Sequence, residues 1–262
     1  MKILWNEATS GAPEMKLLWE ALRKYFSKVA RPDTEVVLRH LLFSANYTRS
    51  LYAELLNDRP LLENVIAAER EGFDAVVLGC WNDPLWEARE IVDIPVVGIG
   101  EAAMLLATTL GFRFAVITVG PKVIPSIEMD LRLYGLESRA IVRPVRSVDP
   151  ASDTEMLLES IGDPHRRFIP NFERVARACI ADGAEVIVVG CGYYGAILSL
   201  HGYNEIPGTG VPVLDCSAAG LKLGESLADL NKSIGLRKSS ALYFQKPPQD
   251  ILDRIRGVHG LA

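Results

Sequence analysis

The chain has 262 residues, of which 49% are hydrophobic and 23% are charged, and its formal net charge is −5. This length allows one large α/β domain or two smaller ones, and the hydrophobic content is ample for a packed core. The acidic balance argues against a nucleic-acid partner held by phosphate contacts.

Short apolar runs alternate with amphipathic segments from the amino terminus onward. In the first part of the chain we expect helices at 14–29, 61–71 and 86–92 and strands at 2–5, 35–42, 75–78 and 94–98. Segment 44–59 is predicted to be irregular or to form a lid, and its Tyr47, Arg49 and Tyr52 are candidates to reach a ligand.

The same alternation continues to the carboxyl terminus. Here we expect strands at 113–118, 139–145, 185–189 and 211–215 and helices at 101–110, 124–134, 154–161, 168–182, 217–229 and 248–256. Strands that alternate with helices predict an α/β fold with mostly parallel sheets flanked by helices.

One sequence pattern occurs twice. The strand at Ala75–Leu78 ends at Gly79-Cys80, and the strand at Glu185–Val189 ends at Gly190-Cys191. We infer a duplication that gives two pseudo-symmetric domains, with the active site in the cleft between them. The last helices are expected to return to the first half, so the predicted domains are 1–98 plus 212–262, which is discontinuous, and 99–211.

Cys80 and Cys191 are the candidate catalytic pair. Ligands bind at the carboxyl ends of strands in open α/β sheets, so two facing cysteines would approach one ligand from opposite sides. A thiolate can remove a proton and a thiol can return one, which is what inversion of a carbon requires. This scheme needs no organic cofactor and no metal. Polar groups near the strand ends could hold a carboxylate or enolate oxygen: Asn6, Thr9, Ser10, Asn82, Asp83, Thr118, Gly192 and Tyr193.

Structural roles compete with these functional ones. Free cysteines are often small core residues, and we predict that role for Cys179 and Cys216. The polar residues near the strand ends also suit turns and helix caps. No cysteines form a CxxC motif and the four histidines lack metal-binding spacing, so no metal site is predicted. The polar residues soon after Met1 do not suit a secretory signal, and we expect a cytoplasmic protein that does not enter a membrane.

Two other functions are alternatives. Gly190–Gly195 fits the G-x-G-x-x-G pattern after a strand, with Asp215 ending the next strand, as in a nucleotide-linked oxidoreductase. The glycines and the proline within 196–210 poorly support the long crossover helix of that fold. A non-catalytic two-lobed protein that binds a small molecule is the second alternative.

The chain resembles the aspartate/glutamate/hydantoin racemase superfamily, and most closely its hydantoin racemase branch. The resemblance is carried by Asp74–Pro84, Asp93–Ala102 and Gly183–Cys191. It implies two similar α/β domains, cofactor-independent proton transfer by Cys80 and Cys191, and assembly into a homo-oligomer. The matching ligand positions are Asn6, Thr9, Ser10, the backbone around Trp81, Asn82 and Asp83, and Thr118, Gly192 and Tyr193.

Differences from the family pattern narrow the range of expected substrates. The branch often begins with Asn-Pro-Asn-Thr, where this chain has Asn6–Thr9 reading Asn-Glu-Ala-Thr. The chain lacks the Asp-Ser and Thr-His pairs of the glutamate racemases, which disfavours glutamate. The decarboxylase branch keeps only the second cysteine, so Cys80 argues against that activity. Trp81, Tyr193 and Tyr194 suggest an aromatic pocket.

These patterns predict a cofactor-independent racemase or epimerase. It would invert a carbon next to a carbonyl in a small molecule, and the resemblance implies 5-substituted hydantoins as the favoured substrates. Aspartate or another amino acid, or a related isomerase reaction of the same superfamily, is the alternative within this class.

Overall fold

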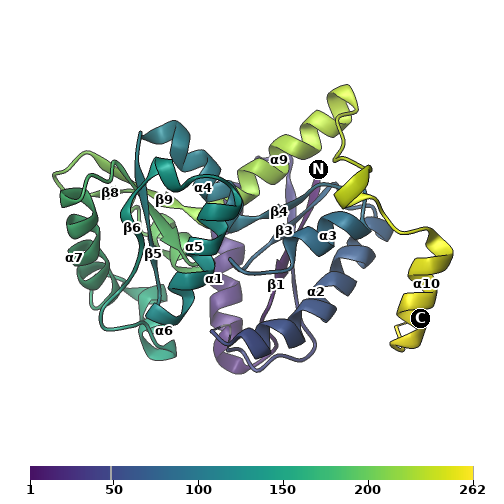
Figure 1. Ribbon diagram of the computed structural model, residues 1–262. Helices are drawn as coiled ribbons and strands as arrows, with labels where there is room; N and C mark the ends of the chain where they lie inside the picture. The colour runs from purple at the N-terminus through teal and green to yellow at the C-terminus, as the bar shows by residue number, and fades with distance from the viewer. Residues whose placement is uncertain (48, 262) are drawn as a thin grey trace.

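The computed structural model describes residues 1–47 and 49–261, and in this part of the chain two sheets lie side by side (Figure 1). The first sheet has the strand order β2-β1-β3-β4, built from β1 (Lys2–Glu7), β2 (Glu35–His40), β3 (Ala75–Leu78) and β4 (Val96–Gly98). The second has the order β6-β5-β7-β9-β8, built from β5 (Phe114–Thr118), β6 (Ala140–Ser147), β7 (Val186–Gly190), β8 (Glu205–Ile206) and β9 (Val211–Asp215).

The two strand orders correspond. Each sheet places its first strand between its second and third, as the repeated sequence pattern predicts, and the third strand pairs on its other side with β4 in the first sheet and with β9 in the second. All the strand pairs are parallel except β8 with β9. β3, β5 and β7 are buried along their whole length, which suits their unbroken apolar sequences because helices cover both faces of such sheets. The predicted α/β fold class is confirmed.

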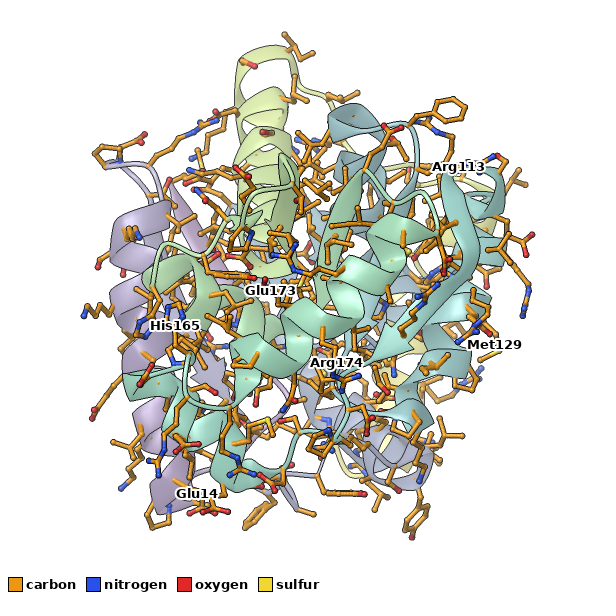
Figure 2. All side chains as sticks on the ribbon, turned by 90° about the vertical axis from the view of Figure 1, so that its left-hand side faces the viewer. Glu14, Arg113, Met129, His165, Glu173 and Arg174 are labelled. Carbon is orange, nitrogen blue, oxygen red and sulfur yellow. The ribbon has the colours of Figure 1, made fainter. Side chains whose placement is uncertain are left out.

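Helices surround both sheets. Their bounds are α1 (Pro13–Val29), α2 (Leu51–Arg70), α3 (Leu85–Ile91), α4 (Ile99–Leu110), α5 (Ile124–Leu133), α6 (Thr154–Gly162), α7 (Phe168–Ala181), α8 (Gly192–Leu200), α9 (Cys216–Ile234) and α10 (Gln249–Val258). Short 3₁₀ turns occupy η1 (Pro121–Val123), η2 (Glu137–Arg139) and η3 (Leu242–Phe244). On α7, Phe172 and Cys179 are buried while Arg174 points outward (Figure 2), so Cys179 has the structural role predicted for it.

Helices α1, α4 and α9 lie between the two sheets (Figure 1). α9 packs against β3 and β4 of the first sheet, while α4 packs against β7 and β9 of the second. The two helices also pack closely on each other, because a Cβ on Gly220 of α9 would lie only 2.8 Å from Cγ2 of Ile99. The last long helix therefore returns to the first half; the exact domain boundaries stay a prediction.

Two segments differ from the sequence-based expectation. The predicted irregular stretch 44–59 is helical from Leu51 onward: the side chain of Ser50 caps α2, and the helix continues through Pro60. The sequence does not predict the start of α2 for two reasons. Many of its apolar residues are exposed, so the amphipathic pattern is weak, and the helix contains a proline. The segment after Cys191 forms α8, which is apolar on all sides and mostly buried, so it has no helical periodicity to detect.

Within residues 1–47 and 49–261, no helix is both long enough and apolar enough to span a membrane.

Candidate active site

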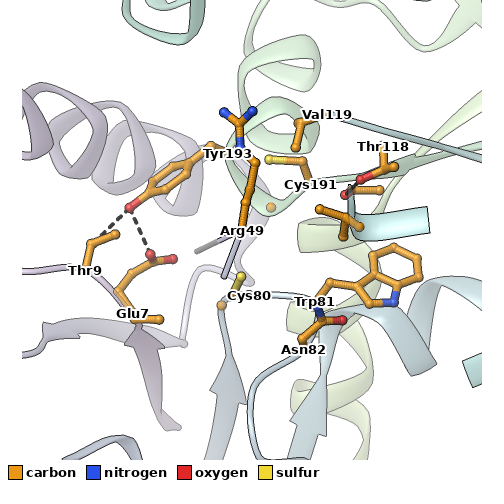
Figure 3. A pocket seen from close by; sticks show the side chains of 15 residues that line it. Glu7, Thr9, Arg49, Cys80, Trp81, Asn82, Thr118, Val119, Cys191 and Tyr193 are labelled. Carbon is orange, nitrogen blue, oxygen red and sulfur yellow. Dashed lines mark hydrogen bonds between the residues drawn. The ribbon is translucent and has the colours of Figure 1, made fainter. Parts of the chain in front are cut away.

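A pocket lies where the carboxyl ends of strands from both sheets meet. It encloses ≈ 560 Å³ including its open mouth. Its walls come from the ends of β1, β3, β5 and β7 and the loops after them (Figure 3). The lining residues are Glu7, Ala8, Thr9, Arg49, Gly79, Cys80, Trp81, Asn82, Thr118, Val119, Val123, Gly190, Cys191, Gly192 and Tyr193.

Cys80 and Cys191 both line this pocket, one from each sheet (Figure 3). Both side chains are partly exposed, unlike those of Cys179 and Cys216, which are buried. The backbone N–H of Cys80 donates to Oδ2 of Asp83 at 2.9 Å, which fixes the turn after β3. Cys191 is the N-cap residue of α8, and its side chain makes no capping hydrogen bond.

The two cysteine loops come together at a pair of glycines. A Cβ on Gly192 would lie 2.5 Å from the carbonyl oxygen of Gly79, closer than any side chain could tolerate. The same Cβ would lie 3.1 Å from Cδ1 of Ile99. A glycine at position 192 therefore allows the two strand ends to approach each other and brings both thiols to one pocket.

The surroundings of the two thiols differ. Burial is the largest influence and raises the pKa of both. The nearby carboxyls of Asp83 and Glu7 raise the pKa of Cys80 further, to well above its ordinary range. At Cys191 the pKa is also raised by burial, but the backbone N–H groups at the start of α8 and the Arg49 guanidinium make that rise smaller. Cys191 therefore loses its proton more readily than Cys80 does.

Glu7 is a buried carboxyl on the pocket wall. Its Oε1 accepts from Nε1 of Trp5 at 2.9 Å, and its Oε2 accepts from the hydroxyl of Tyr193 at 2.8 Å. The Tyr193 hydroxyl also bonds Oγ1 of Thr9 at 3.1 Å (Figure 3). Burial raises the pKa of Glu7, although both hydrogen bonds work in the opposite direction. This network joins the end of β1 to the start of α8 across the two halves.

Six of the predicted ligand positions line the pocket: Thr9, Trp81, Asn82, Thr118, Gly192 and Tyr193. Some of their polar groups already have protein partners. The Thr118 hydroxyl donates to the carbonyl oxygen of Gly190 at 3.1 Å, and the Asn82 amide donates to Oγ of Ser126 at 3.2 Å. Contact of these six with a ligand stays a prediction.

Asn6, Ser10 and Asp83 are not among the residues that line the pocket. Asn6 is fully buried, and its amide donates to the carbonyl oxygen of Leu61 at 3.0 Å. Ser10 donates its N–H to Oδ1 of Asn46 at 2.7 Å. Asp83 lies behind the Cys80 turn, whose N–H it accepts. These side chains hold the loops that carry the pocket.

Two of the three candidate aromatic residues, Trp81 and Tyr193, line the pocket, and Tyr194 lines the hollow beside it. The Trp81 ring packs over Gly100, and its Nε1 donates to Oδ2 of Asp130 at 3.0 Å. Tyr194 is buried and stacks on Phe168, with ring centroids 3.5 Å apart. Tyr193 alone of the three candidate rings directs its polar end toward Glu7 and Thr9. Large aromatic residues after a cysteine do not by themselves reveal which of them face a ligand.

Two charged residues complete the site. Glu7 was absent from the predicted ligand positions, because its place next to Asn6 gave no signal of its own. Arg49 was predicted to be within reach of a ligand, and it lines the pocket; Tyr52 is exposed and lies outside it. In the described part of the chain, no group of three or more His, Cys, Asp or Glu side chains could hold a metal ion.

Comparison with known proteins decides the family. The family model for Asp/Glu/hydantoin racemases matches residues 16–224. The chain belongs to the Asp/Glu/hydantoin racemase family. It is 33% identical over 224 residues to a hydantoin racemase of Pseudomonas sp. strain NS671, an alignment that covers 84% of this chain and 82% of that protein. This racemase is therefore an isomerase, as predicted from the sequence.

Solved structures agree with this membership. An allantoin racemase from Klebsiella pneumoniae superimposes with a TM-score of 0.78 and 27% identity, covering 95% of this chain and 94% of that one. An allantoin racemase from Pseudomonas fluorescens gives a TM-score of 0.76 and 30% identity, covering 95% of this chain and 98% of that one. Membership of a racemase family argues against both alternative functions, a nucleotide-linked oxidoreductase and a non-catalytic binding protein.

Proposed function

We propose that this racemase inverts C5 of a 5-substituted hydantoin, using Cys80 and Cys191 as acid and base and no cofactor. The observation that carries the proposal is the presence of both thiols, from matching strand ends of two sheets, in one pocket. Its relatives include racemases of hydantoin and allantoin, and allantoin is itself a hydantoin with a ureido group at C5. The shared ring is the substrate class that both names support.

The reaction follows from two bases on opposite faces of one carbon. The thiolate of one cysteine takes the C5 proton, and the C–H electron pair moves toward the C4 carbonyl to form an enolate. The thiol of the other cysteine then gives its proton to the opposite face of C5 and becomes a thiolate. Each cysteine is the base for one enantiomer and the acid for the other.

The enolate oxygen needs hydrogen-bond donors. Backbone N–H groups that follow the buried strands, near Trp81 and Gly192, are suited to this role because they are fixed in place before the substrate arrives. A hydantoin also has ring N–H groups, and the Glu7 carboxyl on the pocket wall is an acceptor for one of them.

Exchange with deuterated water tests this function. A single enantiomer of a 5-substituted hydantoin should gain deuterium at C5 and lose its optical rotation faster than it does without enzyme. Cys80→Ala and Cys191→Ala should each abolish the enzymatic racemisation, while Cys179→Ala, which alters a cysteine buried in another part of the fold, should retain it. Full activity in either pocket variant would refute the two-thiol mechanism.

We also propose that the chain works as a homo-oligomer in the cytoplasm. The loop before α2 and the first turns of that helix expose apolar side chains that a partner copy would cover: Leu42, Phe43, Leu51, Tyr52, Leu55 and Leu56. The cytoplasm suits the mechanism because both thiols must stay reduced.

A further inference from the structure

A second hollow adjoins the catalytic pocket. We call it the annex and define it by the lining residues that it does not share with the pocket: Met15, Asn46, Tyr47, Ser152, Asp153, Thr154, Leu157 and Tyr194. It encloses ≈ 890 Å³ including its opening. Cys191 and Tyr193 line both hollows, so a ligand that has its reacting carbon beside Cys191 can extend into the annex.

Arg49 stands at the junction of the two hollows, because it lines both. It comes from the loop before α2, and its Nη1 lies 3.7 Å from the place that a Cβ on Gly120 would occupy, in the loop after β5. The side chain thus reaches across from the first half to the second, and Figure 3 shows its guanidinium beside Cys191 and Tyr193. Among the described residues, no ion pair includes Arg49.

Several polar side chains of the annex, those of Asn46, Ser152, Tyr194 and Asp153, already have protein partners. The Asn46 amide accepts from the N–H of Ser10 at 2.7 Å and donates to its carbonyl oxygen at 3.3 Å. The Ser152 hydroxyl bonds the Tyr194 hydroxyl at 2.6 Å. Asp153 caps α6 by accepting the N–H of Met156 at 2.7 Å. Arg49, with five N–H donors in a planar fork, is the strong donor that remains for a ligand.

We propose that the annex holds the C5 substituent of the substrate and that Arg49 selects substituents bearing a carbonyl or carboxylate oxygen. This inference rests on the proposed racemisation of hydantoins, because it places C5 beside Cys191. A charge-assisted hydrogen bond from Arg49 to such an oxygen is stronger than any contact that an alkyl group of the same shape can make. Arg49 is a specificity residue for the substituent, distinct from the two thiols that act on C5.

A matched pair of substrates tests the inference. 5-Ureidohydantoin and 5-isobutylhydantoin carry C5 substituents with the same number and branching of heavy atoms, and the first has a carbonyl oxygen where the second has a methyl group. We expect kcat/KM for the ureido compound to exceed that for the isobutyl compound by roughly tenfold or more, the usual worth of a hydrogen bond to a charged group. Spontaneous racemisation is measured without enzyme and subtracted.

Arg49→Met should lower the ratio of the two kcat/KM values by roughly tenfold, and Arg49→Lys should lower it less. The loss of the guanidinium near Cys191 affects both substrates through the thiol, so that effect cancels in the ratio. Arg70→Met removes an exposed arginine at the far end of α2 and should leave the ratio as in the unaltered enzyme.

The outcomes separate the two proposals. Equal ratios in the unaltered enzyme and in Arg49→Met, with both substrates racemised, would overturn the role of Arg49 and leave the hydantoin function standing. A preference for the isobutyl compound would overturn the inference as well. Failure of the unaltered enzyme to racemise either compound would refute the proposed function itself.

Discussion

At the scale of single residues, the position of a cysteine carries more information than its presence. Cys80 and Cys191 follow buried strands with matching sequences, and both reach one pocket, whereas Cys179 is buried on the inner face of α7. The alternation of elements and the repeated Gly-Cys pattern were enough to single out the pair. Glu7 and Arg49 could not be singled out as firmly, because their nearness to the thiols depends on how distant segments pack.

The raised pKa values of the two thiols predict a rising pH profile. The active form has one thiolate and one thiol, and at neutral pH both groups are mostly protonated because burial raises both pKa values above their ordinary range. Raising the pH populates the single thiolate, at Cys191 more readily than at Cys80. We expect kcat/KM to increase close to tenfold per pH unit between about pH 6 and pH 8.

Initial rates with a single hydantoin enantiomer, corrected for the uncatalysed rate at each pH, measure this profile. A flat profile across that range would mean that a thiolate already exists at pH 6. That result would contradict the raised thiol pKa values.

At the scale of elements, the loop after each buried strand sets the site, and Gly192 is its tightest point. Gly192→Ala would place a Cβ against the Gly79 carbonyl, which belongs to backbone and cannot move without shifting the Cys80 loop. We expect a loss of roughly 1–3 kcal/mol in the free energy of unfolding, as in other overpacked sites, together with a large loss of activity.

Gly162→Ala is the matched control. Gly162 ends α6 with no atom within 4 Å of an added Cβ, so this change should leave activity intact and should not lower stability. Denaturant unfolding and racemisation rates measure both variants. An active Gly192→Ala enzyme of unaltered stability would show that the two loops do not need this close approach.

Some strands and helices could be predicted from sequence patterns, and others could not. Buried strands such as β3 and β7 were predictable because four or more apolar residues end abruptly at glycine. α8 was not, since its residues are apolar on every side and have no helical period. The start of α2 was hidden for the opposite reason, because several of its apolar residues are exposed and Pro60 lies within it.

At the scale of the whole molecule, the exposed apolar residues near the start of α2 bear on assembly. A patch that includes Leu42, Phe43 and Leu51 is costly to leave in water, so we expect it to be covered by another copy of the chain. Sedimentation equilibrium should give a mass that is a multiple of 28.8 kDa. Leu51→Glu, which changes an exposed position, should shift the equilibrium toward the single chain, and a single chain in the unaltered protein would contradict the proposal.

The central claim is that one thiol serves each face of C5, and enantiomer-specific exchange tests it most directly. Each enantiomer of a 5-substituted hydantoin is incubated separately in deuterated water with Cys80→Ala or Cys191→Ala, and deuterium at C5 is measured above the spontaneous rate. Each variant keeps one base, so we expect each to exchange the proton of one enantiomer without inverting it, and the two variants to act on opposite enantiomers. Exchange of the same enantiomer by both variants, or racemisation by either one, would contradict the two-thiol account.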